Sequence, residues 1–165
     1  MVLFEHMDRA ILTIIFILGL AYWLKWETRK KVSLTKHWRW LLATALVQII
    51  GNAISAIDPN PLRANIFLHA IGGGVASTLL FFYLIKTFEV RLNWRLTLVI
   101  LFFFVSTLGV MNELIEYGLE LMNFGIFSVD THDTWRDFVS NSTGALTAWI
   151  VITASISMLG MRRRK

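Results

Sequence analysis

Five long runs of apolar residues, separated by short polar segments, account for most of the chain. They cover residues 10–26, 38–57, 62–86, 94–117 and 138–160. A helix needs about 20 mostly apolar residues to cross a bilayer, with a tolerance of about 17–25. Flanking polar residues at helical spacing extend the last two helices to about 94–122 and 133–160. The pattern predicts an all-α, polytopic membrane helix bundle with five transmembrane helices, forming a single integral membrane domain over residues 1–165.

Composition supports the membrane assignment and excludes several kinds of chemistry. Hydrophobic residues make up 56% of the chain and charged residues 16%, whereas a soluble domain has about a quarter of its residues charged. The absence of cysteine excludes disulfides, thiol catalysis and cysteine metal sites. The formal charge of +5 comes from basic residues at the ends of the apolar runs. These are typical topology signals, so membrane lipids are the expected partners and nucleic acid is not.

The distribution of Lys and Arg predicts the orientation of the helices. Thirteen of the sixteen lie in the segments 25–39, 86–95 and 162–165, which fall on one side of the membrane. Arg9, Arg63 and Arg136 are the three on the other side. Because cytoplasmic segments carry the excess of Lys and Arg, the N-terminus is predicted outside and the C-terminus inside. The expected location is the cytoplasmic membrane, with several passes.

Several polar residues are predicted within the outer half of the membrane. Counting 1.5 Å per residue from Trp94 puts Glu113 about 29 Å further on, near the outer boundary, while His69 lies roughly 10 Å in from that boundary. A charged side chain in a spanning helix costs roughly 3 kcal/mol, so each one needs a local reason. Four helices contribute to this set: Asn52, His69, Glu113, Glu116, Asp137 and Asn141. We predict that their side chains turn into the bundle and that His69 lies near a carboxylate.

This set is compatible with more than one chemistry. Catalytic candidates, as general acids, bases or proton relays, are His69, Glu113, Glu116, Asp137 and Asn141. Candidates for holding a divalent cation such as Mg²⁺ are Glu113, Glu116, Asp130, Asp133 and Asp137. A purely structural explanation, in which carboxylates stabilise a helix N-terminus, covers Asp130 and Asp133. It fits Glu113 and Glu116 poorly, because they approach a helix C-terminus. No nucleophile motif accompanies the set, so enzymatic activity stays open.

Small residues at four-residue spacing predict which helices pack closely. The second predicted helix has Gly51-x-x-x-Ser55, the third has Ala70-x-x-x-Gly74, and the fifth has Ser140-x-x-x-Gly144-x-x-x-Ala148. Such positions let helix backbones approach one another in lipid. We therefore expect the second, third and fifth helices to pack tightly.

A family resemblance lies in the same residues. Three motifs carry it: Asn112-Glu113-Leu114-Ile115-Glu116, Asp130-x-x-Asp133-Thr134-x-x-Asp137 and Gly144-Ala145. Together with His69 they resemble the YjdF-type family of small prokaryotic membrane proteins, and the segment 137–144 also resembles the related VanZ-like family. VanZ-like proteins usually have Glu-x-x-Gln where this chain has Glu113-x-x-Glu116. That family is associated with resistance to lipoglycopeptide antibiotics, which act outside the cytoplasmic membrane; the resemblance implies no particular reaction.

These observations lead to one main hypothesis and two alternatives. The main one is an integral cell-envelope protein whose outward-facing acidic and histidine site binds or modifies a lipid-linked or amphiphilic envelope component. The first alternative is a cation- or proton-coupled transporter, for which Gln48 is the best candidate to continue a polar path inward. The second is a structural or assembly subunit in which the polar residues only order the helices. The oligomeric state is not indicated.

Overall fold

The computed structural model describes residues 33–122 and 131–162, with side chains to residue 155, and seven separate positions between Ile15 and Trp26. The first predicted helix, 10–26, therefore lies largely outside the described residues. Asp130 and the tail 163–165 also lie outside them.

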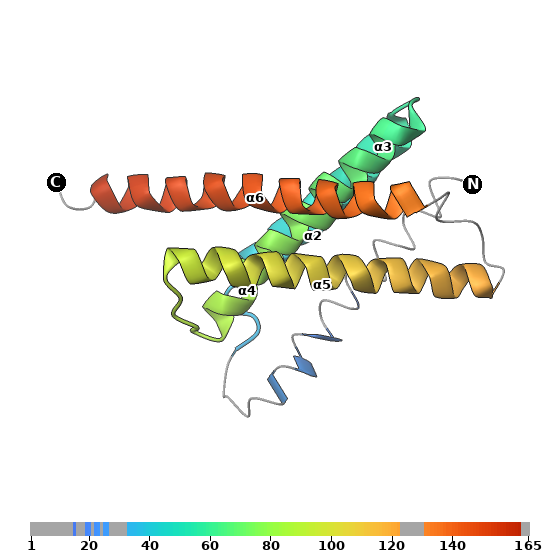
Figure 1. Cartoon of the computed structure of the whole chain (residues 1–165). Helices are drawn as coiled ribbons and strands as arrows, with labels where there is room; N and C mark the ends of the chain where they lie inside the picture. Colours follow the sequence, from blue (N-terminus) through green and yellow to red (C-terminus); the bar gives the residue numbers. More distant parts are fainter. Residues whose placement is uncertain are drawn as a thin grey trace.

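The described segments are helical and contain no strand (Figure 1). In chain order they are α2 (Trp38–Ile57), α3 (Pro61–Phe67), the π-helix η1 (Leu68–Val75), α4 (Ala76–Thr87), α5 (Trp94–Leu121) and α6 (Thr131–Arg162). These bounds confirm the helices predicted at 38–57, 62–86, 94–122 and 133–160, although the last begins two residues earlier. Among the described residues, three helices are long and apolar enough to cross a membrane: Trp38–Ile57, Pro61–Thr87 and Trp94–Leu121.

A tight turn joins α2 to α3. The Asn60 side chain accepts a hydrogen bond from the backbone N–H of Arg63 and so caps α3, with Pro61 at its first position. The Asp58 carboxylate accepts from the backbone N–H of Asn60 at 2.9 Å and from the Arg63 guanidinium at 2.6 and 2.8 Å. Because proline suits the first helical turn and Asn suits the cap, the chain reverses direction here with almost no loop.

The predicted third helix is one continuous rod, but its middle is not α-helical. Residues Leu68–Val75 form the π-helix η1, which includes Gly72, Gly73 and Gly74. Three glycines leave the helix surface without side chains, so a wider turn meets little steric resistance there. The Thr78 hydroxyl donates to the Gly74 carbonyl at 2.9 Å where the π-helix passes into α4. π-helical segments often occur at functional sites, and this one carries His69.

The rod α3–η1–α4 is the central element of the fold. It packs against α2 along its length, and α6 crosses it at η1 (Figure 1). A side chain at Gly144 would collide with the carbonyl oxygen of Ala70, so the backbones of α6 and η1 are in direct contact. At Gly51, a Cβ would lie 3.0 Å from the backbone nitrogen of Gly72. The close packing predicted for the second, third and fifth helices is confirmed, with the third in the middle.

α5 runs antiparallel to α6 and closes the bundle (Figure 1). The two elements meet α4 through a cluster of buried apolar residues, Phe81, Leu101, Val105 and Ala145. On its other face α5 exposes Phe102 and Phe103. Exposed aromatic and aliphatic side chains over a whole helix face fit contact with lipid better than contact with water.

Candidate functional site

The centre of the polar set is a contact between the His69 imidazole of η1 and the Asp137 carboxyl group of α6. His69 Nε2 lies 3.3 Å from Asp137 Oδ2, and the two residues are only 8% and 4% exposed. The prediction that His69 lies beside a carboxylate and that Asp137 turns into the bundle is confirmed. A buried carboxylate next to an imidazole can exchange a proton with it or with a bound molecule.

Asn65, which sequence reasoning missed, is the second partner of Asp137. Its amide nitrogen donates to Asp137 Oδ1 at 2.7 Å and to Asp133 Oδ1 at 3.3 Å. Asn65 lies one turn before His69 and faces the same neighbour. The four-residue spacing of Asn65 and His69, matching that of Asp133 and Asp137, was the available signal.

The two helices carry these residues in matching register. Asn65 meets Asp133 and Asp137, His69 meets Asp137, and Gly73 meets Asn141. Because the contacts advance along both helices together, α3–η1 and the first half of α6 run in the same direction. Small residues on the rod leave room for the longer polar side chains of α6.

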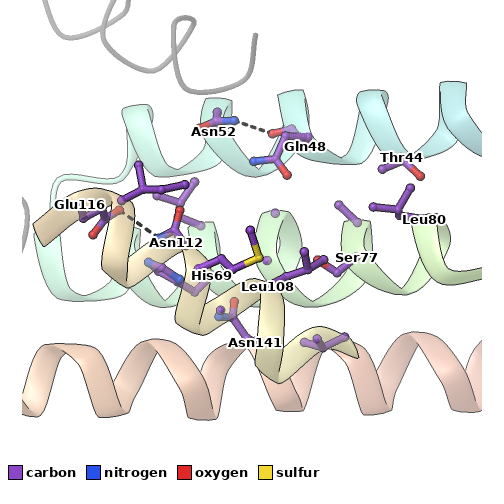
Figure 2. A pocket seen from close by; sticks show the side chains of 18 of the residues that line it. Thr44, Gln48, Asn52, His69, Ser77, Leu80, Leu108, Asn112, Glu116 and Asn141 are labelled. Carbon is purple, nitrogen blue, oxygen red and sulfur yellow. Dashed lines mark hydrogen bonds between the residues drawn. The ribbon is translucent and has the colours of Figure 1, made fainter. Parts of the chain in front are cut away.

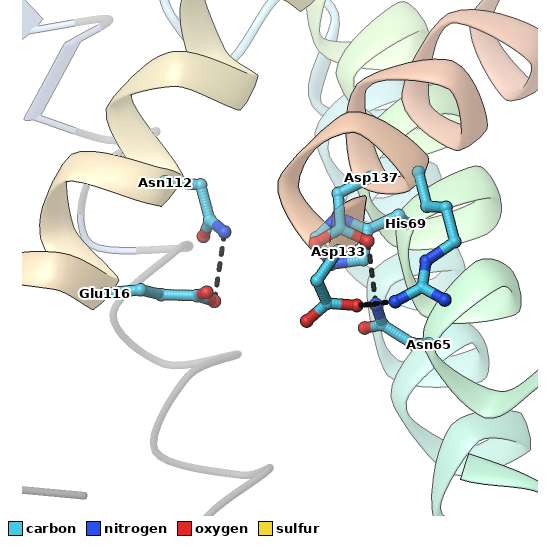
Figure 3. Close-up of polar contacts among 7 residues, drawn as sticks. Asn65, His69, Asn112, Glu116, Asp133 and Asp137 are labelled. Atoms are coloured by element: carbon cyan, nitrogen blue, oxygen red, sulfur yellow. Dashed lines mark hydrogen bonds and ion pairs between the residues drawn. The ribbon is translucent and has the colours of Figure 1, made fainter. Parts of the chain in front are cut away.

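Arg136 supplies the positive charge of this cluster. Its guanidinium donates to Asp133 Oδ1 at 2.8 Å, one turn away on α6. Sequence reasoning counted Arg136 only as an outer topology charge. The pair leaves Asp133 bridged between Arg136 and Asn65, so this carboxylate is part of a network instead of a simple helix-end charge (Figure 3).

The predicted carboxylates of α5 form a second group. Asn112 donates to Glu116 Oε1 at 3.1 Å, and Figure 3 shows this pair facing the His69–Asp137 cluster from α5. Glu113 is half-buried, within hydrogen-bonding reach of the Thr134 hydroxyl on α6. The predicted residues therefore lie in the same part of the bundle, where His69 and Asp137 form a buried contact and Glu116 faces it from another helix.

A cavity of about 240 Å³ lies between the rod, α2 and α5 and reaches Asn141 of α6. Figure 2 shows Glu116 and Asn112 towards one end, and Thr44 and Leu80 towards the other. The polar residues that line it are Thr44, Gln48, Asn52, His69, Ser77, Asn112, Glu116 and Asn141. The apolar ones are Leu68, Ala76, Leu80, Val105, Leu108, Met111, Ile115 and Leu119. The cavity thus connects the group on α5 with His69.

Asn141 is the least satisfied polar residue of the cavity wall. It is 6% exposed, and its Oδ1 is buried without a hydrogen-bond partner. The side chain lies between Gly73 and Gly109, where any larger residue would meet it. An unsatisfied buried acceptor costs about 1–3 kcal/mol. Asn141 lines the cavity, but its Oδ1 is itself buried and packs against Gly73.

The structure gives less support to the predicted cation site than to the His69–Asp137 contact. Within residues 33–122 and 131–155, no three His, Asp or Glu side chains are grouped closely enough to hold a metal ion. Asp130, one of the five predicted ligands, lies outside the described residues.

An all-helical architecture with long apolar helices and a partly buried polar cluster defines a helical membrane protein. The chain belongs to the family described as "Predicted membrane protein (DUF2238)", whose family model matches residues 2–157. No curated protein and no solved structure matches the chain.

Proposed function

We propose that this protein spans the cytoplasmic membrane five times, with its N-terminus outside, and binds an amphiphilic component of the cell envelope in the cavity beside His69. The cavity is the observation that carries the proposal. Its walls combine apolar side chains from η1, α4 and α5 with the polar α2 residues Thr44, Gln48 and Asn52, and the Glu116 carboxylate lies towards one end. An amphiphile likewise combines an apolar chain with a polar head group. The resemblance to the YjdF-type and VanZ-like families supports a role at the outer face of the membrane.

The polarity of the cavity also orients the bound molecule. Glu116 lies at the end of α5 that the Lys and Arg distribution assigns to the outer side. At the opposite end, Leu80 is buried and the Thr44 hydroxyl already donates to the Trp40 carbonyl at 2.9 Å. The head group therefore occupies the Glu116 end and the chain extends inward between α2, α4 and α5. His69 and Asp137, next to the head group, are the pair that a proton-transfer step would use.

Binding fits the arrangement better than either alternative function. A transporter needs a polar path through the inner half of the bundle. Within the described residues, the cavity ends at Thr44 and Leu80 and no charged side chain lines that end. A purely structural role accounts for the contacts of Asn65, His69 and Asp137. It gives no reason for a cavity of about 240 Å³ beside these residues.

Filling the cavity tests the proposal. Ser77 lines the cavity, and Ser77→Leu would place a larger side chain in it. Thr107→Leu is the matched control, because Thr107 is exposed and lies outside the cavity. We expect mass spectrometry of solvent extracts to find an amphiphile that copurifies with the wild type and with Thr107→Leu but is depleted in Ser77→Leu.

If the three proteins accumulate to the same level and their extracts contain equal amounts of the amphiphile, binding in the cavity is refuted. Repeating the purification with a chelator and with added Mg²⁺ tests the predicted cation separately. Loss of the amphiphile on chelation would support a divalent cation at the carboxylates.

A further inference from the structure

We propose, on the basis of the proposed function, that the bound amphiphile is an acyl lipid whose ester or amide carbonyl contacts Gln48 and Ser77. The two side chains come from different elements, Gln48 from α2 and Ser77 from α4, and both line the cavity. Figure 2 shows the Gln48 amide directed from α2 into the cavity. Both groups are uncharged, so they suit the linkage between a head group and its chain better than the head group itself.

Both residues lie between the two ends of the cavity. On α2, Gln48 is four residues from Thr44, which is about 6 Å along the helix axis. On α4, Ser77 is one turn before Leu80 (Figure 2). A ligand that extends from the Glu116 end of the cavity towards Leu80 therefore passes both side chains.

The hydrogen-bonding capacity of Gln48 and Ser77 is unused, whereas their polar neighbours on α2 have partners. The Thr44 hydroxyl donates to the Trp40 carbonyl at 2.9 Å, and the Asn52 amide nitrogen donates to the backbone carbonyl of Gln48 at 2.8 Å. Among the described residues, neither the Gln48 amide nor the Ser77 hydroxyl makes a hydrogen bond. Each side chain is half-buried and lines the cavity, so a bound molecule can reach it.

Gly72 determines where the Gln48 amide lies. A Cβ at Gly72 would be 3.0 Å from Gln48 Nε2 and 3.4 Å from its Oε1. The amide therefore packs against the glycine surface of η1, where a larger residue would displace it. The donor is thus already placed at the cavity wall before a ligand binds, which lowers the cost of forming the contact.

A carbonyl oxygen matches these two side chains. The Gln48 amide has two N–H donors and the Ser77 hydroxyl has one, while a carbonyl oxygen has two lone pairs and can accept from both. Glu116, towards one end, is the only Asp, Glu, Lys or Arg among the described residues that line the cavity. An uncharged acceptor therefore fits the level of Gln48. A plain hydrocarbon chain, such as a polyprenyl chain, would leave both polar groups buried without partners, which costs free energy.

Three photoreactive probes test the inference on the purified full chain. They share a maltoside head group and a dodecyl chain that carries the photoreactive group, and they differ in the linkage, which is an ester, an amide or an ether. The ether replaces the carbonyl by a methylene group. Mass spectrometry of peptides locates the adducts. We expect the ester and amide probes to label cavity peptides about tenfold more than the ether probe, a ratio that corresponds to about 1.4 kcal/mol.

Two variants connect this preference to the two side chains. Gln48→Leu removes the amide and should reduce labelling by the ester and amide probes to the level of the ether probe. Ser77→Ala removes only a hydroxyl and should reduce the preference several-fold. Ser106→Ala is the matched control, because Ser106 is also half-buried but lies outside the cavity. It should leave the preference unchanged.

The possible results separate the ligand class from binding itself. If the ether probe labels the cavity as strongly as the ester and amide probes, the acyl-lipid inference is wrong while binding in the cavity stands. A preference that survives in both Gln48→Leu and Ser77→Ala would overturn it too. If no probe labels cavity peptides of the wild type, the proposed function fails as well.

Discussion

Asp58, in the turn between α2 and α3, makes the stability of the folded protein depend on pH. The hydrogen bond from the Arg63 guanidinium, and then that from the Asn60 backbone, hold the pKa of Asp58 below its ordinary value. A carboxyl whose pKa falls on folding stabilises the folded state fully above its unfolded pKa, about 3.9. The stabilisation is lost as the pH falls through the lower, folded pKa.

Replacing Asp58 by Asn should therefore have an effect that depends on pH. We expect Asp58→Asn to lower the melting temperature at pH 7, and the difference from wild type to shrink below about pH 4. Tryptophan fluorescence during heating, at several pH values in detergent, measures both proteins. The double variant Asp58→Asn/Arg63→Gln should melt close to the single variant if Arg63 acts through this contact. A difference in melting temperature between wild type and Asp58→Asn that stays constant down to pH 3 would contradict this role of the Asp58 carboxylate.

Some site residues could be predicted because a polar side chain within an apolar helix needs a polar partner. His69 and Asp137 are both buried, and their contact with each other supplies such a partner. Asn65 was missed because a single amide near a helix start looks like ordinary surface polarity. The position of Glu116 relative to Asp137 could not be predicted either, because it depends on how α5 lies against α6.

At the scale of an element, the contact between α6 and η1 depends on glycine. A Cβ at Gly144 would collide with the Ala70 backbone, which cannot move aside as a side chain can. We expect Gly144→Ala to separate the two helices and to destabilise the protein by about 1–3 kcal/mol, the usual cost of overpacking. Unfolding in a mixed-detergent titration measures the change.

Gly118 is the matched control for this prediction. It lies within α5, and a Cβ there would have nothing within 4 Å. Because alanine is a better helix former than glycine by about 1 kcal/mol, Gly118→Ala should leave stability unchanged or raise it. Equal losses for the two variants would mean that helix backbone effects, and not the contact with Ala70, explain Gly144→Ala.

Helix bounds followed from the sequence more readily than helix type. Apolar runs bounded by Asn and Pro fixed the start of α3 to within one residue, since caps have clear chemical requirements. The π-helix was not predicted. In the Gly72–Gly74 stretch there are no side chains whose spacing could distinguish a period of 3.6 from a wider one, and the packing of α6 is not visible in the local sequence.

At the scale of the whole molecule, the proposed five-span topology can be tested directly by cysteine labelling. Because the chain has no cysteine, single cysteines can be introduced without background. Pro59→Cys and Val90→Cys place one in the α2–α3 turn and one in the α4–α5 loop, at exposed positions. A membrane-impermeant maleimide added to whole cells should label the first, and label the second only after the cells are opened. The reverse pattern would overturn the orientation and the outward site.

The register between the rod and α6 has a consequence for how the protein is made. The Asn65–Asp133 contact joins residues 68 positions apart, and loop closure over such distances makes contacts slow to form. During synthesis, α3 and η1 enter the membrane well before α6 exists. Until then His69 lacks Asp137, and the glycine surface of η1 lacks its covering helix. The last described helix therefore completes both the buried contact between His69 and Asp137 and the tightest packing, so a chain interrupted before Thr131 presents an unfinished surface to membrane proteases.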